Sequence, residues 1–413
     1  MTQRERQILE LIARNPMISQ AELADTLGIA RSSAAVHISN LIKKGHIIGK
    51  GYVLRSGSYA VVVGGANVDI GGRSRSTLVA GDSNPGKVGL SIGGVGRNIA
   101  HNLSLLGADV RMLTAYGDDL YGQGLMEACT GAGIDMTNAL KVRDEATSTY
   151  LYIADSEGEM ALAVSDMGIC DRIDPEYLGS HYTLLQNAQV IVCDTNIPAA
   201  SLEYLTKHFD VPIFCDPVST IKAEKLRPIL GRIHTLKPNK MEAELLSDIP
   251  IREEGDVEKA AQKLLSMGLK RVVISLGGEG IYAAEEGNCC RMRNLPCTMV
   301  NTTGCGDSAM AALVWAYLEG MSLEESVSAA LAAGSITIES QETISPKCAR
   351  NCSGRECPCR GDPRSPAEIL RISVFLTGNT CCSPAANGFY DTKSRATKGR
   401  PYDMKFTIRR LPP

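Results

Sequence analysis

Apolar residues in the first 45 positions recur with the period of an α-helix. A first amphipathic helix is predicted over residues 4–15. A second is predicted to begin after Ser19, because Glu22 completes a capping box, and to end at Gly28. A third is predicted over residues 30–45. The inward faces of the first and third helices are predicted to consist of Ile8, Leu9, Leu11 and Ile12, and of Ala34, Ala35, Ile38, Leu41 and Ile42.

From Tyr59 onward the pattern changes to short Val- and Ile-rich runs separated by helical stretches, for example YAVVV, VIVCD and RVVIS. This alternation predicts an α/β fold with a mostly parallel sheet and helices on both faces. Ligands of such sheets bind beyond the carboxyl ends of the strands. The first candidates for a binding site are therefore the residues that end the runs: Asn67, Asp69, Asp194, Asn196, Asp216, Asn239 and Gly277.

The segment GDSNPGKV, residues 81–88, nearly matches the phosphate-binding pattern G-x-x-x-x-G-K-[ST]. Val88 stands where a hydroxyl should hold magnesium, and the following VGLSIGG is strand-like, whereas a true phosphate-binding loop opens a helix. The segment is therefore not expected to bind nucleotide.

The composition, with 44% hydrophobic and 22% charged residues, is that of an ordinary globular protein of two or three domains. No run of eighteen apolar residues and no signal-peptide core is present, so we expect a cytoplasmic protein without membrane contact. The charge is uneven. Residues 1–55 carry a net charge of +4 and residues 346–413 carry +8, so the middle carries about -15 within a total of -3.

The last 68 residues, 346–413, lose all apolar periodicity and hold six of the fourteen cysteines and eight of the eighteen prolines. The spacing C-x3-C-x4-C-x-C at Cys348, Cys352, Cys357 and Cys359 fits no common zinc module. We expect this tail to be disordered or to reflect a shifted reading frame.

The front of the chain, residues 1–55, resembles the winged helix-turn-helix of bacterial transcription regulators, with HIIGKGYVLR as the wing and residues 56–58 as a linker. In that family the third helix enters the major groove of DNA. The resemblance implies DNA contacts from Arg31, Ser32, Ser33 and His37 on this helix and from Lys50 on the wing. The alternative is a helical docking or dimerisation module whose positive face is incidental.

The stretch NTTGCGDSAM, residues 301–310, places a glycine turn at the start of a predicted helix. The free N–H groups and the positive dipole end of such a turn suit a phosphate. Asp307, at the same helix start, either caps the helix or accepts a proton from an attacking hydroxyl.

Together with GGVGRNIAHNLSLLG (residues 93–107) and KPNKMEAE (residues 237–244), this stretch resembles the signatures of the ribokinase-like (PfkB) carbohydrate kinases. The resemblance runs from about residue 59 to residue 345. It implies a ribokinase-like sheet with helices on both faces and a small β lid over the sugar, to which residues 81–93 would belong.

The family's roles carry over where residues match. Asp307 would be the catalytic base, and the amides of Gly304, Cys305 and Gly306 would form the anion hole for the phosphoryl group. Cys305 replaces the usual alanine, but only its backbone is needed. Asn301 replaces an aspartate that many members have near a monovalent cation site, which leaves potassium (K+) activation open. The substrate would be held by Asn67, Asp69, Gly94 and Asn98, and ATP by Asn239, Glu242, Ser275, Gly277, Gly278 and Gly280, with Glu242 acting on magnesium (Mg2+) through water.

The segments DSNPGK, SDMGI and HTLKPN resemble the pseudouridine kinases more than ribokinases or fructokinases. This implies ATP- and magnesium-dependent phosphorylation of the 5′-hydroxyl of pseudouridine, with Asp166 either recognising the base or lying solvated in a loop. Inosine, uridine or a free sugar such as ribose remain alternative substrates. A further alternative is a nucleoside-sensing regulator without catalysis, although a pure sensor would need neither Asp307 nor the glycine turn. A homodimer is expected.

Overall fold

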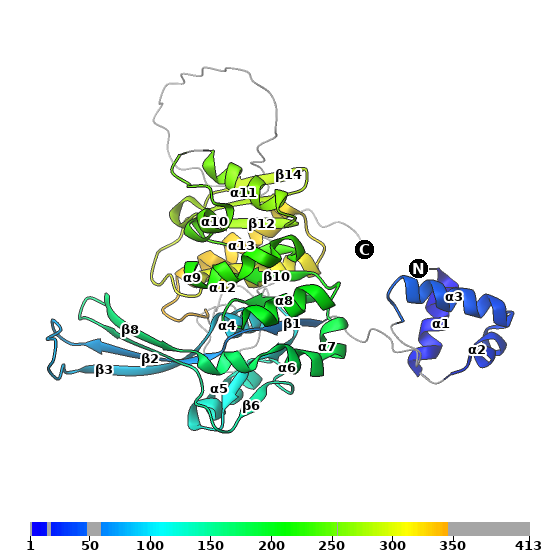
Figure 1. The fold of residues 1–413 in the computed structure, drawn as a ribbon, viewed down its shortest axis with the longest axis horizontal. Helices are drawn as coiled ribbons and strands as arrows, with labels where there is room; N and C mark the ends of the chain where they lie inside the picture. Colours follow the sequence, from blue (N-terminus) through cyan, green and yellow to red (C-terminus); the bar gives the residue numbers. More distant parts are fainter. Residues whose placement is uncertain (1, 15–17, 48–58, 254, 346–413) are drawn as a thin grey trace, which may run out of the picture. The chain divides into compact units, whose positions relative to one another are not determined.

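The computed structural model describes residues 2–14, 18–47, 59–253 and 255–345, which form a helical N-terminal part and a larger α/β part (Figure 1). Residues 48–55 of the predicted wing, with Lys50, lie outside the described residues, as do the linker and the tail. None of the described helices is both long and apolar enough to cross a membrane.

The N-terminal part contains α1 (Gln3–Arg14), α2 (Gln20–Leu27) and α3 (Arg31–Lys43). The predicted capping box is present, since Ser19 Oγ accepts from Glu22 N at 3.2 Å and Glu22 Oε2 accepts from Ser19 N at 2.8 Å. The predicted inward face of α3 is wrong at Ile42, which is 50% exposed. The contact face of this short helix is narrow, and Ile42 lies beyond it. The core residues are Ile8, Ile12, Ile18, Leu23, Ile38, Leu41 and Ile47.

The α/β part is built on an eight-stranded sheet in the order β14-β13-β12-β11-β10-β9-β1-β4. All neighbours from β12 to β4 are parallel, and β13 and β14 are antiparallel, so the predicted mostly parallel sheet is confirmed. The strands are β1 (Tyr59–Val63), β4 (Asp109–Leu113), β9 (Val190–Asp194), β10 (Ile213–Asp216), β11 (Thr235–Leu236), β12 (Arg271–Ser275), β13 (Ile281–Glu285) and β14 (Asn288–Met292).

Helices cover both faces of this sheet because its central strands are apolar on both sides; every residue of β1 and β9 is buried. Alternate residues of β1 enter two different cores, Val62 on one face and Val61 on the other. The first face is covered by α4 (Val95–Leu105), α5 (Leu120–Gly131), α12 (Cys305–Leu318) and α13 (Leu323–Ile338). The second is covered by α6 (Pro175–Ser180), α7 (Tyr182–Gln186), α8 (Ala199–His208), α10 (Lys240–Ser247) and α11 (Asp256–Ser266).

A second sheet of four strands, in the order β3-β2-β7-β8, projects from the body as the expected lid (Figure 1). Residues 86–88 of the apparent phosphate-binding pattern lie in β3 and open no helix, which confirms that the segment is not a P-loop. The lid strands are β2 (Asn67–Ser74), β3 (Gly86–Gly93), β7 (Thr149–Ala154) and β8 (Met160–Asp166); β5 (Ala115–Gly117) and β6 (Leu140–Val142) pair separately.

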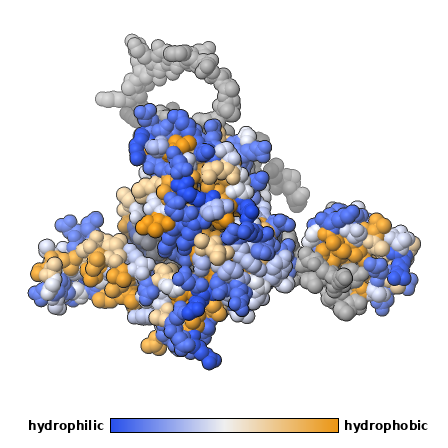
Figure 2. All heavy atoms as spheres, in the orientation of Figure 1, coloured by the Kyte–Doolittle hydropathy of each residue, from blue (hydrophilic) through white to orange (hydrophobic). Residues whose placement is uncertain are grey.

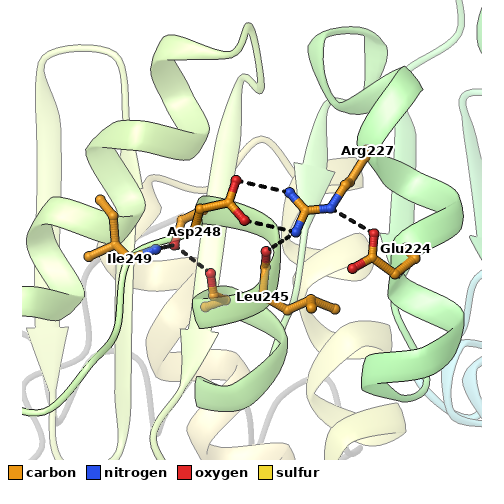
Figure 3. Close-up of polar contacts among 7 residues, drawn as sticks. Glu224, Arg227, Leu245, Asp248 and Ile249 are labelled. Carbon is orange, nitrogen blue, oxygen red and sulfur yellow. Dashed lines mark hydrogen bonds and ion pairs between the residues drawn. The ribbon is translucent and has the colours of Figure 1, made fainter.

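The C-terminal end of α10 is held by Arg227 (Figure 3). Its guanidinium donates to both carboxylate oxygens of Asp248, at 3.1 and 2.9 Å, and to the carbonyl of Leu245. It also donates to Glu224 Oε2 at 2.7 Å. A cation at the last carbonyls of a helix satisfies acceptors that have no partner within the helix. These contacts hold the helix whose first turn carries Asn239 and Glu242.

Candidate active site

The glycine turn before α12 has a geometry that only glycine fits. Gly304 is the N-cap residue with φ of 81°, and a Cβ on it would lie 2.4 Å from the carbonyl oxygen of Thr343. The N–H groups of Cys305 and Gly306 belong to the first turn of α12, whose donors lack acceptors within the helix, and Cys305 N makes only a long contact of 3.4 Å with Thr302 O. The thiol of Cys305 points toward α13, with Sγ 3.8 Å from Gly334 O. Sγ also lies 3.9 Å from Asn301 O, so the thiol sits between α13 and the segment that precedes the turn.

Asp307 occupies the third position of α12 and is half-buried. Its Oδ2 accepts a hydrogen bond from Asn98 Nδ2, on α4, at 2.8 Å. Burial, and next the charge of Asp216, raise the pKa of Asp307 to about 7, against the Asn98 hydrogen bond and the charge of Lys237. A carboxylate whose pKa lies near neutrality is suited to accept a proton.

The substrate candidates meet at the junction of body and lid. Asn67 Nδ2 donates to Asp69 Oδ1 at 2.7 Å, and burial raises the pKa of Asp69 against this bond and the charge of Arg97. Gly94 has φ of 98°, and a Cβ on it would lie 2.6 Å from Ala66 Cα, so glycine is required there. Asp69, Gly94, Asn98 and Asp307 all line one pocket of about 1010 Å³, and Asn67 lines it too.

A buried carboxylate shapes this junction from beneath. Asp194, at the end of β9, accepts from the amides of Gly65 (3.0 Å), Gly96 (2.7 Å) and Asn196 (2.8 Å). Burial raises its pKa to about 6. Asp194 therefore holds the two glycine turns that carry the substrate residues, and does not itself face the pocket.

The structure does not bring Asp166 into the pocket. Asp166 ends β8 and is exposed, whereas its neighbours Ser165 and Met167 line the pocket. Successive strand residues point to opposite faces of a sheet, and Asp166 lies two residues beyond Val164, which is exposed on the outer face of β8. Base recognition by Asp166 is thus not supported by its position.

The nucleotide candidates gather at the carboxyl ends of β11 and β12. Asn239 and Glu242 form a capping box for α10, in which Asn239 Oδ1 accepts from Glu242 N at 2.9 Å and Glu242 Oε2 accepts from Asn239 N at 2.8 Å. Ser275 N donates to Pro238 O at 2.9 Å, which joins the two segments. Gly277 and Gly278 face open space, whereas Gly280 is required by the turn, since a Cβ on it would lie 2.0 Å from Met292 O.

The site fits a magnesium ion that enters with the nucleotide. Among the described residues, no three His, Cys, Asp or Glu side chains are arranged to hold a metal ion. Magnesium in such sites is held by substrate phosphates, water and one or two carboxylates. The buried carboxylate of Glu242, beside Asp216, fits this requirement through water. The bound ion would screen the charge of the ATP phosphates.

The side chain of Asn301 joins two loops near the glycine turn. Asn301 Oδ1 accepts from Thr303 N at 3.0 Å, and its Nδ2 donates to Gln341 O at 3.2 Å. The side-chain amide of Asn301 therefore donates to a backbone carbonyl oxygen of the neighbouring loop, and it lacks the negative charge of an aspartate.

Sequence reasoning missed several residues that the fold adds to the site. Lys237 makes an ion pair with Asp216, with Nζ and Oδ2 3.0 Å apart. Arg97 and His101 line the pocket from α4, and Tyr150 and Tyr152 line it from the lid. Lys237 directly follows a strand and precedes the Asn239 motif, which was a readable signal. The two tyrosines gave none, because alternation alone does not tell which face of a lid strand turns inward.

Comparisons with known proteins agree with this geometry. Residues 58–349 match the model of the pfkB family of carbohydrate kinases, and residues 1–48 match a winged helix-turn-helix DNA-binding model. The chain is 40% identical over 339 residues to the uncharacterized sugar kinase YeiI of Escherichia coli K12, covering 82% of this chain and 94% of that protein. It is 41% identical over 295 residues to the pseudouridine kinase of the same organism, covering 71% and 94%.

The structure of Arabidopsis thaliana ribokinase with ribose and ATP superposes with a TM-score of 0.64 at 24% identity, covering 76% of this chain and 99% of that one. Fold and site thus define a ribokinase-like phosphotransferase that acts on an alcohol group. The chain belongs to the pfkB family of carbohydrate kinases, and it carries an N-terminal winged helix-turn-helix domain.

Proposed function

We propose that the protein transfers the γ-phosphoryl group of ATP to the 5′-hydroxyl of pseudouridine. The observation that carries this proposal is the hydrogen bond between Asn98 and Asp307, because it joins the substrate pocket to the glycine turn of α12. A hydroxyl bound beside Asp69 and Asn98 would lie next to both a base and a set of phosphate-binding amides. Sugar or nucleoside phosphorylation needs this combination.

In the proposed reaction, Asp69 and Asn98 hold the ribose hydroxyls and Asp307 takes the proton of the 5′-hydroxyl as it attacks. The amides of Gly304, Cys305 and Gly306 hold the phosphoryl oxygens, where negative charge is spread during transfer. Asn239, Glu242 and the glycines at 277 and 278 would hold ATP and its magnesium ion. The proposed mechanism contains no monovalent cation.

The lid supports a nucleoside rather than a free sugar. Tyr150 and Tyr152 lie on its inner face with ring centroids 6.1 Å apart, and both line the pocket. Two rings so placed offer an apolar, aromatic surface to a planar base. The pocket volume of about 1010 Å³ exceeds what a pentose needs. The 41% identity to a pseudouridine kinase favours pseudouridine as that nucleoside.

The test is ADP release by the purified chain with ATP, magnesium and one acceptor at a time: pseudouridine, uridine, inosine, ribose or fructose. We expect kcat/KM for pseudouridine to exceed that for the other acceptors by at least about tenfold, since base contacts are lost with a sugar. Higher turnover on uridine or inosine would make that nucleoside the substrate in place of pseudouridine, and the protein would still be a nucleoside kinase. Turnover on ribose alone would contradict a nucleoside site.

We further propose that the N-terminal domain binds DNA through the start of α3. Arg31, Ser32 and Ser33 are exposed there and His37 is half-buried, so their side chains can reach a groove. Gel shifts of the full chain with genomic fragments should show binding that weakens steeply as salt rises, because phosphate contacts release counterions. Arg31→Ala should weaken binding several-fold. Binding unaffected by salt and by this change would instead favour a docking module.

We also propose a homodimer formed through the outer face of the lid. Strand register places Leu90, Ile70, Leu151 and Val164 in one row across all four strands. Val88, Leu162 and Val164 are 75%, 63% and 57% exposed, and Figure 2 shows apolar side chains gathered over the lid. A second copy would offer the same apolar face in return. Light scattering of the purified chain should give twice the monomer mass. The variant Leu162→Lys should give the mass of a monomer.

A further inference from the structure

A buried ion pair lies beneath the first turn of α12 and has no part in the reaction described so far. Lys237 directly follows β11, and Asp216 ends the neighbouring strand β10. Their Nζ and Oδ2 atoms are 3.0 Å apart, and the two side chains are only 8% and 9% exposed. Buried ion pairs add little to stability compared with apolar packing. Their presence beside a reaction site therefore suggests a role in the chemistry.

The ammonium of Lys237 lies against the proposed phosphoryl site. A Cβ on Gly306 would lie 3.4 Å from Lys237 Nζ, so only the missing side chain separates the ammonium from the α12 backbone. Gly306 is one of the residues whose amides face the incoming phosphate. An anion bound at these amides would come within contact distance of Lys237.

The charges around Lys237 leave it protonated. Burial lowers its pKa, but Asp216 and, farther away, Asp307 and Glu242 outweigh this effect and raise it. Three carboxylates therefore act on the charge of Lys237, and Asp216 is the one paired with it directly. The pocket lining, to which Lys237 does not belong, includes Arg97 and Lys222, and both are engaged on the substrate side: Arg97 donates to Ile92 O at 3.0 Å, and Lys222 donates to Asn196 Oδ1 at 2.6 Å.

We propose that Lys237 is a further catalytic residue, whose ammonium contacts the phosphoryl group during transfer, and that Asp216 is its positioning residue. This inference rests on the proposed transfer from ATP. The 5′-oxygen of the substrate bonds to the γ-phosphorus while the bond from phosphorus to the β–γ bridging oxygen breaks, and that electron pair leaves with ADP. The hydroxyl proton passes to Asp307. Lys237 keeps its proton throughout and balances the charge of the phosphoryl oxygens.

The first measurement compares Lys237→Met with the unchanged chain. Methionine keeps the length of the side chain and removes its charge. We expect kcat to fall by about 100-fold or more, while KM for the nucleoside stays within about threefold, because the nucleoside contacts lie at Asp69 and Asn98. Asp216→Asn should lower kcat less, by about tenfold, because the ammonium remains but loses its partner.

The second measurement is the pH dependence of kcat/KM, which a merely structural role would not move in this way. The groups that act on Asp307 are Asp216 from β10, Asp194 from β9, Lys237 after β11, and Asn98 from α4. Lys237 lowers the pKa of Asp307, and Asp216 raises it. The acid limb should therefore shift to higher pH in Lys237→Met and to lower pH in Asp216→Asn.

Removal of one member of a buried pair can prevent folding. The double variant Asp216→Asn with Lys237→Met removes both charges together and should fold while showing the same loss of kcat. A folded double variant with kcat within twofold of the unchanged chain would overturn the proposal, as would acid limbs that shift in the same direction. If the unchanged chain turns over no acceptor, the proposed phosphoryl transfer itself is wrong. Normal turnover by Lys237→Met refutes only the role of Lys237.

Discussion

Asp307→Asn should lower kcat by about 10³-fold, because the variant can no longer take the proton of the attacking hydroxyl. Asparagine keeps the size of the side chain and can still accept the hydrogen bond from Asn98 Nδ2. KM for the nucleoside should therefore change little. Steady-state kinetics with the best acceptor, supported by a single-turnover experiment, measure the two constants separately.

The same substitution should make the protein more stable. In the folded chain the pKa of Asp307 is about 7, against an ordinary value of 3.8. The folded state therefore disfavours the charged form of this side chain. The resulting loss of folding stability grows as pH rises from 3.8 to about 7 and stays at its full size above pH 7. The melting temperature of Asp307→Asn should thus exceed that of the unchanged chain by more at pH 8 than at pH 5.

Glu325→Gln provides the matched control for Asp307→Asn. Glu325 holds the same third position in α13, where it accepts from Ser322 N at 2.9 Å as part of a capping box. This change should slightly lower stability and leave kcat unchanged. Equal losses of kcat in the two variants would mean that Asp307 acts only as a helix cap.

Gly304→Ala should lower kcat by about 10² to 10³-fold, the usual effect of disturbing an oxyanion-type site. An added Cβ would lie 2.4 Å from Thr343 O, and the φ of 81° disfavours alanine. The turn must therefore shift, and the first-turn amides of α12 shift with it. Kinetics, together with ATP affinity from calorimetry, will show whether the loss lies in transfer or in binding.

Gly320→Ala is the control for the backbone strain alone. Gly320 has φ of 73° just beyond the other end of α12, and nothing lies within 4 Å of an added Cβ. Both alanine variants should lose similar stability from the positive φ, but only Gly304→Ala should lose activity. A comparable loss of kcat in Gly320→Ala would mean that general destabilisation explains both results.

Local features of the sequence were sufficient for the elements and for the class of chemistry. The capping pair Ser19 and Glu22 and the glycine turn before Asp307 follow from contacts between near neighbours in the chain, and the apolar run at Tyr59 was enough to predict a strand. Val88 and the strand-like residues after it were likewise enough to exclude a P-loop. Such features depend on backbone geometry over a few residues, and the residue types at those positions are enough to predict that geometry.

The tertiary structure alone decided which of these residues meet. Asn98 and Asp307 are 209 positions apart, and Lys237 and Asp216 come from neighbouring strands whose order the sequence does not give. The pKa of Asp307 depends on burial and on charges from three other segments, so no local pattern could reveal it. The position of Asp166 outside the pocket lining was decided in the same way, because the partners of a lid strand determine which of its residues point inward. The sequence by itself thus determined the parts and the chemistry of the site, and packing over long chain separations decided its geometry and electrostatics.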